Sequence, residues 1–331
     1  MDSHIRNQGP PDRNRNTELF AGAQPAAPSD LRRAYQFARG VAQMQPDTTV
    51  GHRLVWVRGV AFGSMTIAAN DSAFAIVGRH TQCGLVLPDD PFVALRHLLV
   101  RSIALPSGGV ALRIFDLHTD LKFRLADGST AQSIFAEGPV AIGVGEYALV
   151  ALPNDLKDAP GELPAPVVDT PPAVRDQIKV LEAAMSPYRA NARPFHKTRI
   201  TLMPMPVMVG EALPPSVGRL AGGGYTLTLE RAGRGASVAL SEEDLLRGIV
   251  IGRSEKCHSE TLRQNTDMGT SRVHLLILKE GDQVYAYDLA STQGTYAFGS
   301  AVRRARLPDA GISLFLGATR EAVRLTWHRR F

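Results

Sequence analysis

Three short blocks in the last third of the chain combine side chains that could do chemistry. They span residues 252–253 (Gly-Arg), 271–274 (Ser-Arg-Val-His) and 288–295 (Asp-Leu-Ala-Ser-Thr-Gln-Gly-Thr). Ser271 and His274 could act as a nucleophile and its base, but no acidic orienting residue or oxyanion motif accompanies them, so the blocks do not predict catalysis. Arginines beside a hydroxyl are instead suited to clamping an anion, because a phosphate needs fixed, charge-assisted donors.

Other kinds of chemistry find little support along the chain. It contains no GxxxxGK[ST] loop, GxSxG elbow, HExxH pair or acidic cluster, so we expect neither an enzyme nor a bound cofactor. Its two cysteines, Cys83 and Cys257, form no CxxC pair, which argues against a disulfide scaffold or structural zinc.

Charge gives only a weak indication of partners. The 37 basic and 32 acidic residues leave a formal charge of +5 with no long basic run, so nucleic-acid binding is not expected. That alternative rests on a few paired arginines near the end of the chain: Arg303, Arg304, Arg306, Arg329 and Arg330. The first residues lack the apolar core of a signal peptide, and no later run approaches the ~18 apolar residues that span a bilayer. We therefore expect a cytoplasmic protein without membrane partners.

The elements that must position these blocks are mainly strands. Residues 1–28 are too polar to offset the entropy of ordering and are expected to be a disordered tail. Residues 31–44 carry one apolar helical stripe, which includes Phe37 and Met44, behind a Ser29-Asp30 cap. Short strand-like runs then follow at 54–57, 64–69, 74–78, 97–100, 111–117 and 147–152. We assign residues 29–152 to one β-rich domain with a leading helix.

A proline-rich stretch separates this domain from a second one. Residues 153–190 form an expected linker that carries one helix, at 172–188, beyond its prolines. Residues 191–331 form the second β-rich domain, with strand candidates at 201–209, 225–230, 236–240, 249–253, 274–278, 284–289, 312–316 and 321–327. Short strands without alternating helices favour sandwiches or barrels.

The two β-rich domains also repeat each other. AIVGRHTQC matches VIGRSEKC, RHLLV matches VHLLI, and FDL matches YDL, in the same order along the chain. Arg79 and Cys83 therefore correspond to Arg253 and Cys257, which predicts that both cysteines are buried apolar residues at the start of a strand. The repeat indicates duplicated whole domains rather than a solenoid.

The three blocks together resemble the signature of the forkhead-associated (FHA) family, GR, SxxH and DxxSxNGT. They are followed by RLPDAGISLFLG, which resembles the last motif of that family. The resemblance implies an all-β fold: two FHA-like β-sandwich domains joined by the proline-rich linker with its short helix. It also implies that loops at one end of the second sandwich grip a phosphothreonine.

The resemblance implies a role for each residue that matches a position of the family motifs. Arg253 would brace the loops and face the phosphate, Ser271 would donate its hydroxyl, and Arg272 would supply another donor. Thr292 would approach the phosphate, and Gln293 stands where the family usually has asparagine. The longer amide adds a torsion that costs on the order of 0.5–1 kcal/mol to immobilise.

Three further residues would support this pocket. Gly294 permits the tight turn that presents Thr292, His274 holds the loops together, and Gly252 precedes the arginine. Gly269 stands where some family members carry an arginine that selects an acidic residue three places after the phosphothreonine, so no sequence preference is assigned.

The first copy lacks most of these groups. Arg79 and His97 remain, but the donor positions hold Ala94 and Leu95. The third block has lost its asparagine, glycine and threonine positions to Leu121, Lys122 and Phe123. We interpret this copy as a structural or docking module; the alternative is an unusual phosphate site built from Arg79, Arg96 and Lys122.

The predicted function is non-enzymatic recognition of phosphothreonine peptides, as an adaptor in kinase-dependent signalling. Its partners would be a threonine-phosphorylated protein and, upstream, a Ser/Thr kinase. The alternative is an assembly component that uses FHA folds for phosphorylation-independent contacts, because a fold does not fix a function.

Overall fold

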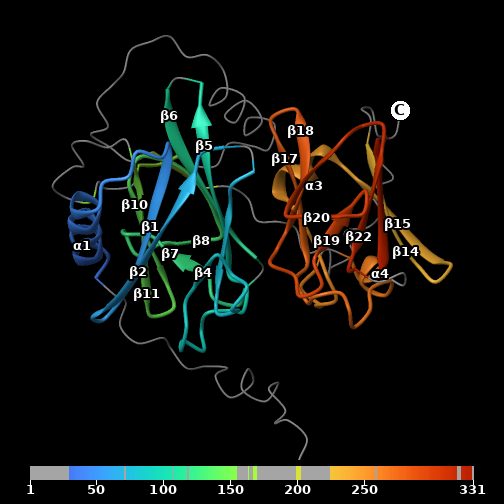
Figure 1. Cartoon of the computed structure of the whole chain (residues 1–331), viewed down its shortest axis with the longest axis horizontal. Helices are drawn as coiled ribbons and strands as arrows, with labels where there is room; N and C mark the ends of the chain where they lie inside the picture. The colour runs from blue at the N-terminus through green and yellow to red at the C-terminus, as the bar shows by residue number, and fades with distance from the viewer. Residues whose placement is uncertain are drawn as a thin grey trace, which may run out of the picture.

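Two β-sandwiches lie side by side in a computed structural model of the chain (Figure 1). The structure describes residues 30–154 except 71, 107 and 118, then 163, 167–169 and 199–202, and finally 224–329 except 258 and 319–321. The expected tail at 1–28 and the expected linker helix at 172–188 lie outside the described residues. No helix of the described part is long and apolar enough to cross a membrane.

The first sandwich consists of an outer and an inner sheet, the inner one facing the second sandwich. The outer sheet has the order β2-β1-β11-β10-β7-β8. These strands are β1 (Gly51–Arg58), β2 (Ala61–Ala68), β7 (Phe123–Arg124), β8 (Thr130–Ala131), β10 (Val140–Val144) and β11 (Tyr147–Pro153). The inner sheet has the order β12-β13-β9-β6-β5-β3-β4. Its strands are β3 (Ala75–Gly78), β4 (Leu85–Val86), β5 (Leu98–Leu105), β6 (Gly109–Asp116), β9 (Ser133–Glu137), β12 (Val167–Asp169) and β13 (Arg199–Leu202).

The second sandwich repeats this plan. Its outer sheet has the order β15-β14-β23-β22-β19-β20 and its inner sheet the order β16-β17-β18-β21. The outer strands are β14 (Tyr225–Arg231), β15 (Arg234–Leu240), β19 (Thr295–Ala297), β20 (Ser300–Val302), β22 (Ile312–Leu316) and β23 (Val323–Arg329). The inner strands are β16 (Ile249–Ile251), β17 (Leu275–Glu280), β18 (Gln283–Asp288) and β21 (Arg304–Leu307). The expected all-β architecture of two sandwich domains is confirmed.

Each sandwich encloses its own core because alternate residues of a strand point to opposite faces. In the first, Leu54 and Leu149 of the outer sheet pack with Ile114 of the inner sheet. In the second, Trp327 packs with Ile277 across the same kind of interface. Both cores consist almost entirely of buried aliphatic and aromatic side chains, which makes hydrophobic burial the main stabilising contribution.

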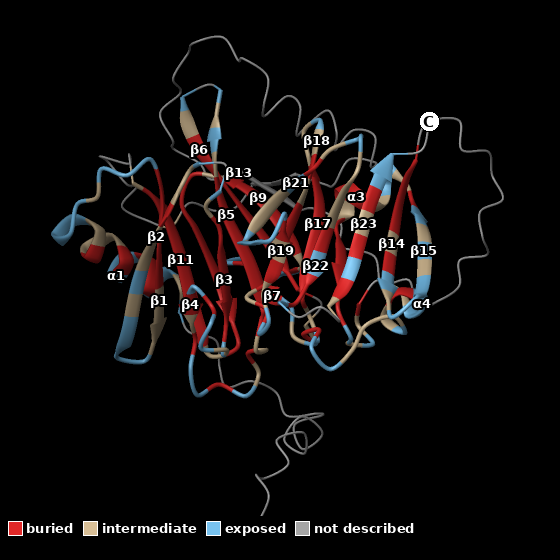
Figure 2. Ribbon diagram, turned by 45° about the vertical axis from the view of Figure 1, so that its right-hand side comes forward, coloured by how far each residue is buried: buried red, intermediate tan, exposed pale blue. Residues whose placement is uncertain are grey.

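Helix α1 (Leu31–Met44) covers the exposed side of the first outer sheet, as Figure 2 shows. The Asp30 side chain accepts hydrogen bonds from two backbone N–H groups of the first turn, so the expected cap is present. Tyr35 and Val41 pack on Val150 of β11. Phe37 and Met44, which we expected in the same apolar stripe, are 41% and 76% exposed, because they lie to one side of the buried helix face. Phe37 still meets Phe62 edge to face.

The two inner sheets pack against each other, so that the four sheets form a stack (Figure 2). Equivalent positions of the repeat meet there: Phe115 of the first sandwich and Tyr287 of the second lie in one buried cluster, which Phe74 also joins. Cys83 and Cys257 also lie in this cluster, and burial raises the pKa of their thiols to about 11 and about 12. Both cysteines are therefore buried as expected, but neither begins a strand: Cys83 lies two residues before β4, and Cys257 precedes the short helix Glu260–Arg263.

One strand lies elsewhere than we expected. We predicted a strand at 201–209 within the second domain, but the strand there is β13, and it pairs antiparallel with β9 of the first sandwich. The reason is that β9 is otherwise an open sheet edge, whose unpaired N–H and C=O groups need a partner. Two short helices, α3 (Glu242–Arg247) and α4 (Glu260–Arg263), were also not predicted from the sequence.

Candidate functional site

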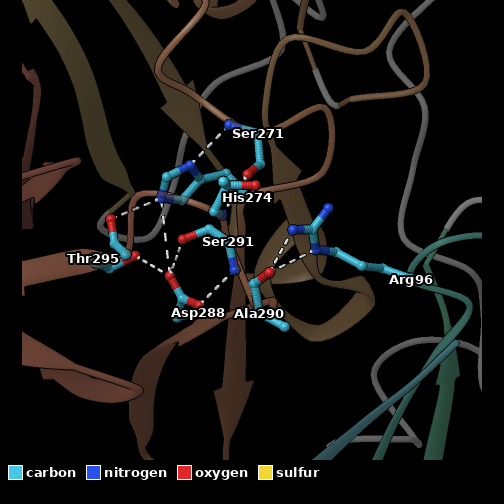
Figure 3. Close-up of polar contacts among 9 residues, drawn as sticks. Arg96, Ser271, His274, Asp288, Ala290, Ser291 and Thr295 are labelled. Atoms are coloured by element: carbon cyan, nitrogen blue, oxygen red, sulfur yellow. Dashed lines mark hydrogen bonds and ion pairs between the residues drawn. The ribbon is translucent and has the colours of Figure 1, made fainter. Parts of the chain in front are cut away.

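The three sequence blocks meet at one end of the second sandwich. Residues 252–257 leave β16, residues 271–274 lead into β17, and residues 289–294 join β18 to β19. These loops are contiguous because the strands that carry them are neighbours or face each other across the core. Figure 3 shows polar contacts of the second and third of these loops.

The first two loops run against each other without room for a side chain. A Cβ added to Gly252 would lie 2.2 Å from the carbonyl oxygen of Arg272, so only glycine fits there. The backbone N–H of Arg253 donates to Ser271 O (3.2 Å), and Arg253 Nε donates to Thr270 O (3.0 Å). The arginine thus braces the loop through Nε, and its exposed end retains the terminal amino groups as further donors.

Ser271 connects the second loop to the third. Its Oγ accepts a hydrogen bond from the backbone N–H of Thr292 (2.9 Å), although the side chain is largely buried. A hydroxyl can accept and donate at the same time. The Ser271 hydroxyl hydrogen is therefore available to a ligand placed at the surface between these loops.

His274 lies beneath the site and touches both loops. Its Nδ1 accepts from the Ser271 backbone N–H (3.1 Å), and its Nε2 lies 3.2 Å from the carbonyl oxygen of Gly294, to which it donates. Burial lowers the pKa of His274 to about 4, so the imidazole is neutral at pH 7. With both ring nitrogens engaged by backbone groups, His274 links the loops and is not placed to act as a base.

Asp288 fixes the turn that presents Thr292. Its carboxylate accepts from the backbone N–H of Ser291 (2.9 Å) and from the hydroxyls of Ser291 and Thr295 (2.6 Å each). Figure 3 shows these contacts converging on one buried carboxylate. The sequence blocks contain all three residues, but our interpretation gave them no role; the DxxS spacing, which places a side-chain oxygen over a backbone N–H three residues on, was the available signal.

The exposed rim of the site carries the remaining predicted residues. Arg253, Arg272, Thr292 and Gln293 are exposed, and Gly294 adopts a positive φ of 75°. The structure therefore brings all eight residues singled out in the sequence into one loop cluster, with cations and hydroxyls at the surface and His274 below.

One contributor comes from the other sandwich and was not anticipated as such. Arg96, in the loop before β5, donates from Nε (2.9 Å) and from Nη2 to the carbonyl oxygen of Ala290 (Figure 3). Ala290 has a positive φ of 55°, which is uncommon for a residue other than glycine. Arg96 is 8% exposed, and burial lowers the pKa of its guanidinium.

The corresponding end of the first sandwich keeps the framework and lacks the donors. His97 Nδ1 accepts from the Ala94 backbone N–H (3.0 Å) and Nε2 contacts Leu121 O (3.0 Å), the pattern seen around His274. Thr119 donates to Asp116 as Ser291 does to Asp288. No hydroxyl stands at Ala94, however.

One of the three cations of the alternative phosphate site is directed away from it. Arg79 Nε donates to the backbone carbonyl of Val93. Arg96 is directed to Ala290 of the second sandwich. Arg79 and Lys122 are both exposed, and Arg79 keeps its terminal amino groups as Arg253 does, so the loss of Arg96 and of the hydroxyl is what argues against a phosphate site in the first sandwich.

Comparison with known proteins agrees with this geometry. Residues 249–312 match the FHA domain family, and this segment contains every residue of the predicted pocket. An FHA domain is therefore present in this part of the chain. No match was found among curated proteins.

Solved FHA domains are also similar to parts of the chain. One, described in a study of phosphothreonine-dependent FHA domain interactions, is 28% identical and covers 32% of this chain and 95% of its own, with a TM-score of 0.26. The FHA domain of the CT664 protein from Chlamydia trachomatis is 21% identical over 32% of this chain and 96% of its own (TM-score 0.26). FHA-1 of Mycobacterium tuberculosis Rv1747 is 19% identical over 33% and 99% (TM-score 0.25).

Proposed function

We propose that the loop cluster of the second sandwich binds threonine-phosphorylated segments of a partner protein. The observation that carries this proposal is the arrangement of Arg253, Ser271 and Arg272. Two exposed cations flank a hydroxyl whose oxygen is already held by the Thr292 N–H. Such a site is built before the ligand arrives, so little side-chain ordering opposes binding.

The phosphate group matches this set of donors. At pH 7 it carries a charge of about −1.5 to −2 and three acceptor oxygens. The terminal amino groups of Arg253 and the Ser271 hydroxyl would take two of these oxygens, with Arg272 and Thr292 closing over the rim. Each charge-assisted bond contributes about 1.5–3 kcal/mol, so loss of the phosphate would remove most of the affinity. Gln293, exposed beside Thr292, would contact the backbone of the bound peptide.

The residues beneath the rim are placed to support binding and not to catalyse a reaction. His274 is neutral and has both nitrogens bonded to backbone groups, and Asp288 is saturated with donors from its own turn. Neither is free to move a proton during a reaction. We therefore infer a non-enzymatic adaptor that reads the product of a Ser/Thr kinase, and we place its action in the cytoplasm.

The first sandwich is proposed to be a degenerate copy with a docking role. The shared His97 and Asp116 framework supports a common origin, and the contact of Arg96 with Ala290 supports a role in holding the second copy. Assembly without phosphate recognition is the second candidate function, favoured by the loss of donors at Ala94 and Leu95.

A calorimetric titration of the full chain with phosphothreonine peptides tests the proposal. Peptides from a degenerate phosphothreonine library would be compared with their unphosphorylated forms. We expect saturable binding of phosphorylated peptides only, abolished in Arg253→Ala. Equal affinity for both forms would replace phosphate recognition with the assembly function.

A further inference from the structure

A second concave site lies between the two sandwiches, away from the phosphopeptide loops. It is a cleft of about 360 Å³ bounded by the β5–β6 face of the first inner sheet and by the hairpin that joins β17 to β18. Figure 1 shows the β5–β6 hairpin and the β17–β18 hairpin at the same end of the two sandwiches. Its walls contain Arg101, Arg113 and Arg304.

Two of these arginines are held side by side by the register of the sheet. Arg101 of β5 lies directly opposite Arg113 of β6, and Arg113 lies opposite Phe135 of β9. Residues paired in this way project from the same face, where like charges repel and weaken the pairing. A sheet that places two guanidinium groups together under a second domain needs negative charge nearby.

Among the described residues, Glu280 is the carboxylate that contacts the arginines of the cleft. Glu280 accepts from Arg101 and from Arg304 (3.1 Å), both through Oε2. Asp282 also borders the cleft, but at its exposed rim. Arg101 and Arg304 thus share the Glu280 carboxylate, and Arg113 has no ion pair in the part of the chain that the structure describes.

Arg113 is the arginine of the cleft that Glu280 does not contact. Its side chain is 1% exposed, and neither Nε nor Nη2 has a hydrogen-bond partner in the part of the chain that the structure describes. Its guanidinium lies over the ring of Phe115, 4.4 Å from the centroid. Burial lowers the pKa of Arg113 to about 9, which still leaves it charged at pH 7. A buried cation whose donors are unmet is strongly unfavourable unless an anion compensates it.

The remaining wall of the cleft is apolar. Ile103 and Leu105 follow Arg101 at two-residue intervals on β5 and therefore share its face, next to Phe135. A ligand held by the arginines would lay its other end against these side chains.

We propose that this cleft binds a small organic anion, with a phosphate or carboxylate group at Arg113, Arg101 and Arg304 and an apolar group against Ile103, Leu105 and Phe135. Both sandwiches supply donors, so an occupied cleft holds the two inner sheets together. This site is separate from the phosphopeptide loops and does not depend on their function.

Phenyl phosphate, benzoate and inorganic phosphate are suitable probes, titrated into the full chain by calorimetry and by thermal unfolding. We expect saturable binding of phenyl phosphate or benzoate, with an increase in Tm, and weaker binding of inorganic phosphate because it lacks the apolar part. Whichever of phenyl phosphate and benzoate binds more tightly identifies the anionic group that the cleft prefers. Binding by none of the three at millimolar concentration would overturn the proposal.

Variants assign the binding to the cleft. Arg113→Met keeps an unbranched side chain without the charge and should reduce the affinity for the tighter-binding probe at least tenfold. If Arg113→Met does not fold, Arg304→Met, on the opposite wall, should show the same loss. The titrations are made in the Arg253→Ala background as well, which removes binding of phosphate by the phosphopeptide loops, and Arg234→Met, at an exposed position of β15, is the control that should bind the probe unchanged. Unchanged binding in the folded cleft variants, or its loss in Arg253→Ala, would refute this site.

Discussion

The guanidinium of Arg96, on the first sandwich, donates from Nε to the carbonyl oxygen of Ala290 on the second, at 2.9 Å. Ala290 immediately precedes the Ser291-Thr292 turn and has a positive φ of 55°. Such a conformation is strained for alanine and persists only where surrounding contacts enforce it. The first sandwich therefore helps to set the shape of a loop that belongs to the other.

From this contact we predict that Arg96→Met weakens phosphopeptide binding about three- to tenfold, although Arg96 lies outside the motif blocks. Loss of the hydrogen bonds leaves the Ala290 carbonyl unpaired and frees the turn, so part of the binding free energy is used to order it. Titration calorimetry against the wild-type chain measures the change. Arg33→Met, at an exposed position of α1, is the matched control. An unaltered affinity in Arg96→Met would mean that the turn keeps its shape without the first sandwich.

The second prediction concerns the donors themselves. Arg253→Ala and Ser271→Ala should each reduce phosphopeptide affinity tenfold or more, since each removes a charge-assisted bond of about 1.5–3 kcal/mol. Arg306→Ala, at an exposed position of β21, should have no effect. If both pocket variants are folded by circular dichroism and bind normally, the phosphate is not bound in these loops.

Gln293→Asn is expected to act in the opposite direction. The shorter amide loses one freely rotating bond, so it should tighten phosphopeptide binding by up to about 1 kcal/mol if the Gln293 amide contacts the peptide. The gain is measured as a lower Kd for the same phosphopeptide. A Kd that does not move would show that Gln293, although exposed at the rim, makes no contact.

The site could be read from the sequence because its geometry is local. At Gly252 the backbone leaves no room for a side chain, and at Gly294 it turns through a positive φ. Glycine is the residue that meets both requirements, so they are visible in the sequence. The spacing of Ser271 and His274 likewise reports a bond within one loop. Strands with clear alternation and the capped α1 were predicted for the same reason.

Contacts between the two sandwiches have no comparable signal in the sequence. Tyr287 looks like an ordinary strand residue, yet it packs against Phe74 of the first sandwich at 5.2 Å between ring centroids. Arg96 occupies a position where the second copy has Val273, and nothing in its type indicates a partner nearly two hundred residues away. The pairing of β13 with β9 was missed because an open sheet edge is a property of the fold, which one segment does not display.

The last prediction is a loss of stability in mild acid, caused by histidines that are buried in the neutral form. Burial lowers the pKa of His52 to about 3 and those of His97 and His274 to about 4, from an ordinary value of 6.5. Below pH 6.5 the unfolded chain takes up protons that the folded chain does not, so the free energy of unfolding falls as pH decreases towards 4. Asp116 opposes this, because burial raises its pKa to about 7 and the folded state gains its proton first.

Three histidines outnumber this one carboxyl group, so we expect the free energy of unfolding, measured by urea denaturation, to decrease from pH 7.5 through 6.0 to 5.0. His52 is the best residue to vary, because it lies away from the loops and its Nδ1 contacts only the Ser102 hydroxyl (2.8 Å) in the part of the chain described. His52→Gln removes one proton-binding group from the unfolded state and should flatten the pH dependence, whatever its effect on stability at pH 7.5. If the free energy of unfolding of His52→Gln depends on pH as steeply as that of the wild type, His52 is protonated equally in the folded and unfolded states. The loss of stability in acid would then have to arise from His97 and His274.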